Sequence, residues 1–159
     1  KDLQNREGDT ALSCACDKGH VEIARMLLEA GAKKDLQDCG GYTALIRACE
    51  NGHVEMARVL LEAGANKDLQ NREGDTALSC ACDKGHVEIA RMLLEAGAKK
   101  DLQDCGGYTA LIRACENGHV EMARVLLEAG ENKDLQNRES DTALSCACDK
   151  GHKEIACML

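Results

Sequence analysis

The chain has 159 residues, of which 44% are hydrophobic and 30% charged, and its formal net charge is −8. It contains two tyrosines but no phenylalanine or tryptophan, so the large aromatic side chains that usually fill a globular core are missing. No apolar run approaches the roughly 18–20 residues of a membrane-spanning helix, and nucleic-acid binding depends on clustered Lys and Arg that this acidic chain lacks. The composition therefore predicts no membrane insertion, no nucleic-acid partner and no deep central core.

The sequence is built from tandem repeats. Residues 1–33 recur unchanged at 67–99, and residues 34–66 recur at 100–132 with one change, from Ala65 to Glu131. These two kinds of unit, type A and type B, resemble each other, so the elementary period is 33 residues and the double period is 66. A final unit of type A stops early, which gives the order A-B-A-B-A over residues 1–33, 34–66, 67–99, 100–132 and 133–159. Because no linker separates the units, we expect a single domain over residues 1–159.

Each unit carries the signals of two short helices. In the first unit a polar segment around Gly8 predicts a tight turn, and Thr10 is placed to cap the helix that follows it. Gly19 ends this helix, and residues 21–30 have the apolar spacing of a second helix, with Gly31 in the left-handed position beyond its end. Neither helix is long enough to be stable alone in water. The sequence therefore predicts an all-α fold in which helix pairs pack on their neighbours.

Thin, continuous packing of small apolar side chains accounts for the missing aromatic residues. In a repeat array each unit contacts only its neighbours, so the core is a ribbon of Leu, Ile, Met, Val, Ala and Cys. We expect Leu12, Leu27, Leu28 and their counterparts in the other units to be buried in this ribbon.

The pattern G-x-T-A-L-x-x-A-C-x-x-G-H-x-E-x-A-x-x-L-L-E-A-G-A resembles the ankyrin repeat, and it covers the whole chain. The resemblance implies an α-solenoid of stacked helix-turn-helix units with hairpin-like turns along one edge. The T-P-L-H segment of that family reads T-A-L-S at residues 10–13 and T-A-L-I at residues 43–46, without the proline and the histidine. We expect their loss to lower the stability of each repeat and to leave the fold unchanged.

The eleven cysteines occupy fixed places in the repeat. Equivalent cysteines of like units lie two repeats apart, farther than the roughly 4.4–6.8 Å that separates the Cα atoms of a disulfide. We expect Cys16 and Cys49 to be small core residues, and Cys39 and Cys105 to be exposed at the turn tips. So many free thiols favour a reducing, cytoplasmic location.

The Cys-x3-His spacing of Cys16 and His20 recurs along the chain and raises the question of a zinc site. Zinc needs about four ligands that converge on one point, whereas Gly19 ends the helix between this pair. A Cys–His nucleophile would need a third, orienting group and a pocket. We therefore predict no metal, no cofactor and no catalysis, and we expect His20 and its counterparts at turns and helix caps. Glu22 and Arg25 in the second helix are expected on its solvated outer face.

Types A and B differ at eleven of 33 positions, mainly in the turn and the first helix. In the ankyrin family, the turn tips and the exposed side of the first helix form a concave recognition surface. Tyr and Arg, which stand at two of these positions in type B, are enriched among residues that dominate binding energies. The alternative is that these positions simply vary freely. The resemblance implies partner-binding residues at Arg6, Asp9, Asp17, Tyr42, Arg47, Glu50, Asp75, Tyr108, Arg113 and Glu116.

We therefore predict a non-catalytic scaffold that binds a protein partner along its concave face. One alternative is a structural or elastic array without a tight ligand. Another is an engineered or consensus repeat protein, which the near-perfect copying favours and the free thiols disfavour. The terminal units lack the polar caps that solenoids need. This leaves open end-to-end packing through these units, and it favours a segment of a longer protein or a chain completed by a partner.

Overall fold

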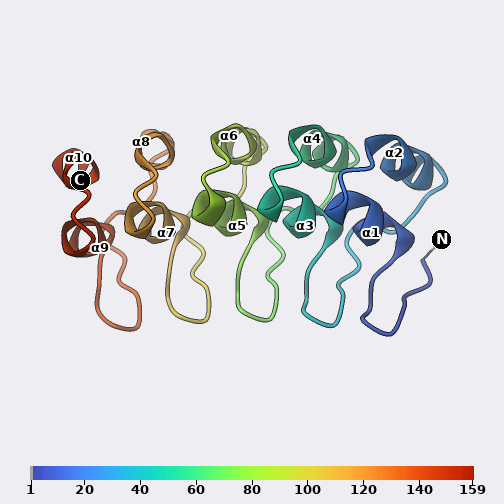
Figure 1. The fold of residues 1–159 in the computed structure, drawn as a ribbon, viewed down its shortest axis with the longest axis horizontal. Helices are drawn as coiled ribbons and strands as arrows, with labels where there is room; N and C mark the ends of the chain where they lie inside the picture. Colours follow the sequence, from blue (N-terminus) through green and yellow to red (C-terminus); the bar gives the residue numbers. More distant parts are fainter. Residues whose placement is uncertain (1) are drawn as a thin grey trace.

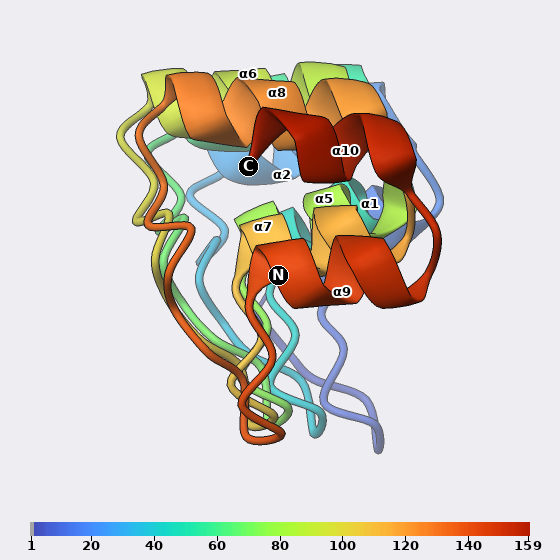
Figure 2. The same ribbon diagram turned by 90° about the vertical axis from the view of Figure 1, so that its left-hand side faces the viewer.

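The computed structural model describes residues 2–159, which form ten α-helices and no strand. The helices make five antiparallel pairs that stack in one direction, and hairpin-like turns project from one edge (Figures 1 and 2). The first helices of the pairs, which we call the inner helices, are α1 (Ala11–Asp17), α3 (Ala44–Glu50), α5 (Ala77–Lys84), α7 (Ala110–Glu116) and α9 (Ala143–Asp149). The second helices, the outer helices, are α2 (Val21–Glu29), α4 (Val54–Glu62), α6 (Val87–Glu95), α8 (Val120–Glu128) and α10 (Lys153–Met158). The expected all-α solenoid is confirmed.

Each inner helix begins at a threonine cap, as predicted. The Ser13 amide donates to the Thr10 hydroxyl at 3.1 Å, and the Thr10 amide donates to the Ser13 hydroxyl at 2.8 Å. This reciprocal pair satisfies two amides at the start of α1 that have no partner within the helix. In type B units Ile46 stands where type A has serine, and only the bond from its amide to the Thr43 hydroxyl remains.

The core is a ribbon between the inner and outer rows, as expected for a solenoid. Cys16 and Cys49 are fully buried in it. The leucine prediction is only partly right. The leucine of the Thr-Ala-Leu segment is buried in the first four units, and the first leucine of the Leu-Leu pair is buried at Leu60, Leu93 and Leu126. Leu28 and the second leucine of the later pairs are only partly buried, because the second leucine lies about 100° further round the helix, at the flank of its buried stripe. Leu27, the first leucine of its pair, is also only partly buried, unlike its counterparts in the next three units.

Identical sequences differ in burial at the two ends of the array. Ile23 is 50% exposed, whereas its equivalent Ile89 is fully buried because a preceding repeat covers it. Leu144 is 44% exposed, whereas its equivalent Leu78 is 1% exposed under a following repeat. Leu12 is buried even though it lies in the first unit, which agrees with the prediction that it belongs to the core.

The hairpin-like turns are joined by one backbone hydrogen bond per repeat. The Cys39 amide donates to the Glu7 carbonyl at 2.9 Å, and the Arg72 amide donates to the Gly40 carbonyl at 2.9 Å. The same bond recurs between the later turns. These bonds hold successive turn tips in register along the edge of the solenoid.

The histidines also link neighbouring repeats. His53 Nε2 lies 3.1 Å from the Asp17 carbonyl oxygen of the preceding repeat, and His86, His119 and His152 make the same contact one repeat further on each time. Although each histidine stands at the N-cap position of an outer helix, its side chain makes no capping hydrogen bond. The expected position at a helix cap is therefore confirmed, but the ring binds the end of the preceding inner helix and does not cap its own helix.

Charged side chains cover the outer helices, as expected, but they pair between repeats. Arg25 lies 2.6 Å from Glu55 of the next unit, and Arg91 lies 2.7 Å from Glu121. All four side chains are about half exposed. Pairs of this kind contribute at most about 1 kcal/mol each, because water screens them. The outer face is therefore a solvated surface with weak links along the array.

Candidate interaction surface

The exposed sides of the inner helices and the adjoining turns form the concave face. It has two hollows, which together contain seven of the ten residues predicted to bind a partner. The first hollow contains Asp9, Asp17 and Arg47, and the second contains Tyr42, Glu50, Asp75 and Arg113. Arg6, Tyr108 and Glu116 line neither hollow.

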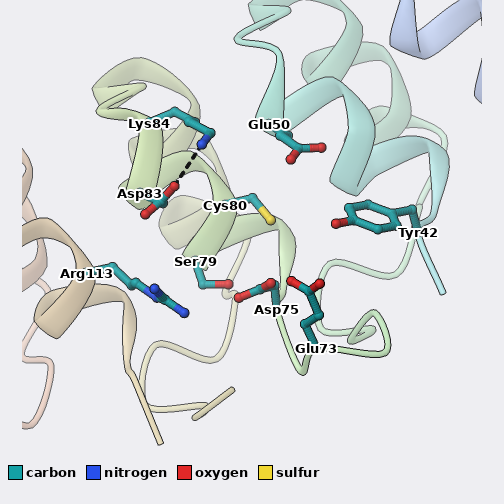
Figure 3. A pocket seen from close by; sticks show the side chains of 9 residues that line it. All are labelled: Tyr42, Glu50, Glu73, Asp75, Ser79, Cys80, Asp83, Lys84 and Arg113. Atoms are coloured by element: carbon teal, nitrogen blue, oxygen red, sulfur yellow. Dashed lines mark ion pairs between the residues drawn. The ribbon is translucent and has the colours of Figure 1, made fainter. Parts of the chain in front are cut away.

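The hollow above α5 has a volume of about 190 Å³ and is shared by three repeats (Figure 3). Its floor comes from one type A unit, with Asp75 in the turn and Ser79 in the helix (Figure 3). Tyr42 and Glu50 come from the preceding type B unit, and Arg113 comes from the following one. The complete lining consists of Tyr42, Glu50, Glu73, Asp75, Ser79, Cys80, Asp83, Lys84 and Arg113.

A corresponding hollow of about 320 Å³ lies above α1. It is lined by Glu7, Asp9, Ser13, Cys14, Asp17, Lys18 and Arg47. Each of these residues stands 66 positions before a residue that lines the hollow above α5. Sequence reasoning missed Glu7 and Ser13 as lining residues, although the 66-residue period places their counterparts Glu73 and Ser79 in the same surroundings.

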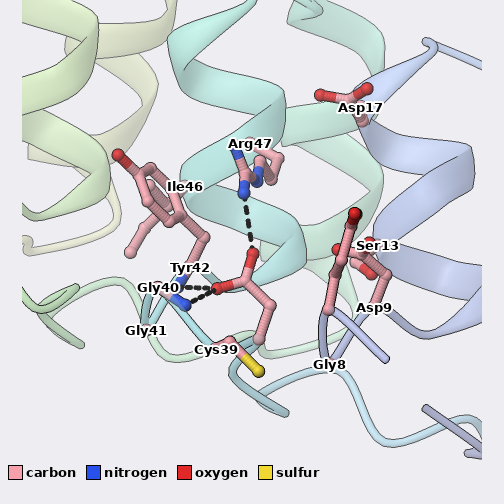
Figure 4. A network of polar contacts seen from close by, with 12 residues as sticks. Gly8, Asp9, Ser13, Asp17, Cys39, Gly40, Gly41, Tyr42, Ile46 and Arg47 are labelled. Carbon is pink, nitrogen blue, oxygen red and sulfur yellow. Dashed lines mark hydrogen bonds and ion pairs between the residues drawn. The ribbon is translucent and has the colours of Figure 1, made fainter. Parts of the chain in front are cut away.

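Arg47 and Tyr42 lie side by side at the start of α3 (Figure 4). Both contact a buried aspartate that sequence reasoning did not single out. Arg47 lies 2.7 Å from Asp38, whose side chain is 4% exposed, and the guanidinium stacks over the Tyr42 ring at 3.9 Å from its centroid. Burial alone would raise the pKa of Asp38, but the hydrogen bonds from Arg47 and from the Tyr42 and Gly40 amides hold the pKa below its usual value. The Arg–Tyr pair is therefore fixed before any partner arrives.

The same arrangement recurs in the fourth unit. Arg113 pairs with Asp104, whose side chain is almost completely buried, and stacks over Tyr108 at 4.3 Å from the ring centroid. Arg113 also lines the hollow above α5, although its guanidinium group is already paired with the Asp104 carboxylate. Arg47 and Arg113 are thus each paired with an aspartate of their own repeat.

Acidic side chains dominate the hollow above α5. Glu50, Glu73, Asp75 and Asp83 line it, and Lys84 is paired with Asp83 at 3.0 Å. Burial raises the pKa of Asp75, while a hydrogen bond from Asn71 and the charge of Arg113 act in the opposite direction. The hollow therefore offers carboxylates whose charge the neighbouring cations do not fully balance.

The lining offers little for catalysis or metal binding. Burial raises the pKa of the Cys80 thiol, so this cysteine lacks the thiolate character of a nucleophile. Within residues 2–159, no three His, Cys, Asp or Glu side chains are grouped so that they could hold a metal ion. No helix of this part of the chain is long and apolar enough to cross a bilayer.

A family model of three consecutive ankyrin repeats matches the chain four times, over residues 1–71, 32–104, 63–137 and 98–159. These overlapping matches cover every unit of the solenoid. The chain belongs to the ankyrin-repeat family. Ankyrin repeats are generally non-catalytic modules for protein interaction. No curated protein sequence is significantly similar to this ankyrin-repeat chain.

Proposed function

We propose that residues 1–159 act as one ankyrin-repeat domain that binds a protein partner along its concave face and catalyses no reaction. The observation that carries this proposal is the recurrence of one acid-rich hollow, with the same seven residue types, 66 positions apart. The outer face has weak ion pairs that link neighbouring repeats and an open recess between α4 and α6, whereas the recesses of the concave face are lined mainly by acidic side chains. A recess that excludes water around an inserted side chain is typical of the positions that dominate binding energy.

The charge of the hollows favours a partner that presents lysine or arginine side chains. A cation entering the hollow above α5 would meet Glu50, Glu73 and Asp75 within one recess. Arg113 would repel this cation less than an unpaired arginine would, because its guanidinium group forms an ion pair with Asp104. Complementary charge mainly raises association rate and specificity, and it makes binding sensitive to salt.

The spacing of the hollows favours a partner that is long or itself repetitive. Both hollows open on the same face, above α1 and α5, so one extended segment could place a basic side chain in each. Once the first hollow is filled, the second binding step becomes intramolecular, which strengthens binding through effective concentration. Tyr42 and Tyr108, each fixed by its arginine, would add rigid aromatic contacts beside this path.

The test uses synthetic peptides of equal length, one with paired lysines in a Gly/Ser background and one with glutamates in their place. We expect fluorescence anisotropy to show binding of the lysine peptide, weakening with added salt. The double change Glu7→Gln and Glu73→Gln should weaken binding at least tenfold. The control Glu55→Gln with Glu121→Gln removes the same charge from the outer helices and should leave binding nearly unchanged. Equal weakening by both pairs would contradict the assignment to the concave face.

A second comparison examines the tyrosines. Replacement of both Tyr42 and Tyr108 by Ala should reduce capture of a partner in a pull-down more than the outer-face double change does. The opposite result would contradict the proposal. If neither peptide nor partner binds the unmodified chain, the structural array becomes the better account, since backbone bonds between the turns already link all five repeats. All eleven cysteines are free, which supports a reducing, cytoplasmic location for either role.

A further inference from the structure

The two type B units differ at a single position, and that position is buried in both. Ala65 is 7% exposed in the second unit, and Glu131 is 5% exposed at the equivalent place in the fourth. Residues 34–64 and 100–130 are otherwise identical. The chain therefore places a carboxyl group where its own second repeat has a methyl group, and the second repeat serves as an internal reference.

The Glu131 carboxyl is only half satisfied. Its Oε1 accepts a hydrogen bond from the Leu111 amide at 2.8 Å, in the first turn of α7. Its Oε2 is buried and has no hydrogen-bond partner. A buried polar atom without a partner costs about 1–3 kcal/mol, and more when it carries charge. The ionised side chain is thus poorly accommodated, although it lies close to a helix N-terminus.

Charged and titratable groups of the preceding connector, α5 and α7 interact with Glu131. Lys100 and Asp101 belong to the preceding connector, where the lysine favours the ionised form and the aspartate opposes it. The buried thiols of Cys82 in α5 and Cys115 in α7 also interact with it. The Thr109 hydroxyl lies near enough to favour the ionised form without making a normal hydrogen bond to Oε2.

Burial outweighs these influences and raises the pKa of Glu131 from 4.5 to about 7. The hydrogen bond from the Leu111 amide and the nearby Thr109 hydroxyl act in the opposite direction but do not compensate for the lost hydration. A carboxyl group whose pKa is higher in the folded than in the unfolded state stabilises the fold fully only below the unfolded value. Its contribution is lost as the pH rises from about 4.5 through about 7.

We propose that Glu131 is a pH-sensitive link between α7 and the connector after α8, closed when its carboxyl group is neutral and weakened when that group ionises. The link lies within the fourth repeat, near its C-terminal end, and beside Cys82 of the third repeat. Its weakening should therefore loosen the C-terminal end of the concave face and leave the hollow above α1 unaffected. This inference does not depend on the proposed function, because it rests on the surroundings of Glu131 alone.

Urea unfolding from pH 5 to pH 8 tests the link, with Glu131→Gln as a neutral variant of nearly equal shape. The folding equilibrium constant of the unmodified chain should fall relative to that of the Gln variant by roughly 10- to 100-fold over this range. Glu131→Ala, which gives the fourth repeat the sequence of the second, should follow the Gln variant in its pH dependence. Parallel pH profiles for all three chains would overturn the proposal.

A direct measurement follows the amide signal of Leu111 by NMR during a pH titration. We expect its chemical shift to change with a midpoint near pH 7 and to stay flat in Glu131→Gln. A midpoint below pH 5 would overturn the proposal. The change Ala65→Glu recreates the site beside Leu45, with every facing residue repeated, and should install the same pH dependence there. A pH-independent Ala65→Glu variant would overturn the assignment to these surroundings.

Discussion

One position in the turn separates the effect of backbone conformation from that of repeat stacking. Gly74 has φ of +86°, and a Cβ atom there would lie 2.7 Å from the Cys105 amide nitrogen of the next turn. The equivalent residue of the last unit is Ser140, which has φ of +69° and no described turn packed beyond it. Serine thus occurs at the position where its Cβ atom has room, and glycine occurs where the next turn would clash with a Cβ atom. The changes Gly74→Ser and Ser140→Gly should therefore have effects of unequal size on stability.

The expected magnitudes follow from these contacts. A left-handed conformation costs a residue with a side chain about 1–2 kcal/mol, while glycine in the unfolded chain offsets about 0.5–1 kcal/mol of that through its greater entropy. Ser140→Gly should therefore stabilise the chain by at most about 1 kcal/mol. Gly74→Ser should also disrupt the bond from the Cys105 amide to the Glu73 carbonyl at 2.8 Å. Its total cost should be about 2 kcal/mol or more.

Urea unfolding of both single variants measures these free energies, provided that the slope against urea concentration stays constant. Hydrogen exchange adds a local measurement, because the Cys105 amide should exchange faster in Gly74→Ser and keep its protection in Ser140→Gly. If Gly74→Ser lowers the free energy of unfolding by no more than Ser140→Gly raises it, the backbone conformation alone accounts for both effects. The argument from close approach of neighbouring turns would then be refuted.

Three further outcomes test the packing of the array. Leu78→Ala should lower the free energy of unfolding by about 2–5 kcal/mol, because this leucine is buried. Leu144→Ala, at the same place in the last unit, should lower it by about 1 kcal/mol. Equal losses in urea unfolding would contradict the idea that a following repeat buries Leu78. Cys39 should react with a thiol reagent in the native protein, whereas Cys82, whose pKa burial raises far above its usual value, should react only on unfolding. Replacing His86 with Ala should lower the free energy of unfolding by about 1 kcal/mol through the lost bond to the preceding repeat. A zinc chelator should leave the helical circular-dichroism signal of both the unmodified chain and this variant unchanged, and unfolding on chelation would support a metal site.

Local signals in the sequence were sufficient for the framework. The 33-residue period, the threonine before each inner helix and the glycine after the first four outer helices predict the helix pairs. Such features act through hydrogen bonds and backbone conformations within a few residues, so they need no knowledge of the neighbours. The 66-residue period also predicted that concave-face features recur in alternate repeats, although it did not show which side chains meet there.

Contacts between repeats were decided by the tertiary structure. Ile23 and Ile89 occur in identical sequences, yet one is half exposed and the other buried, because only the second has a repeat packed before it. The contact of His53 with the preceding repeat likewise depends on how neighbouring repeats pack. Within one repeat, the pairing of Arg47 with the buried Asp38 depends on how the turn folds back beside the inner helix. The sequence alone shows only that Glu131 stands where the second repeat has Ala65. Only the packed structure places that carboxyl group out of water with one oxygen unpaired, because burial depends on neighbours that sequence spacing alone does not bring together.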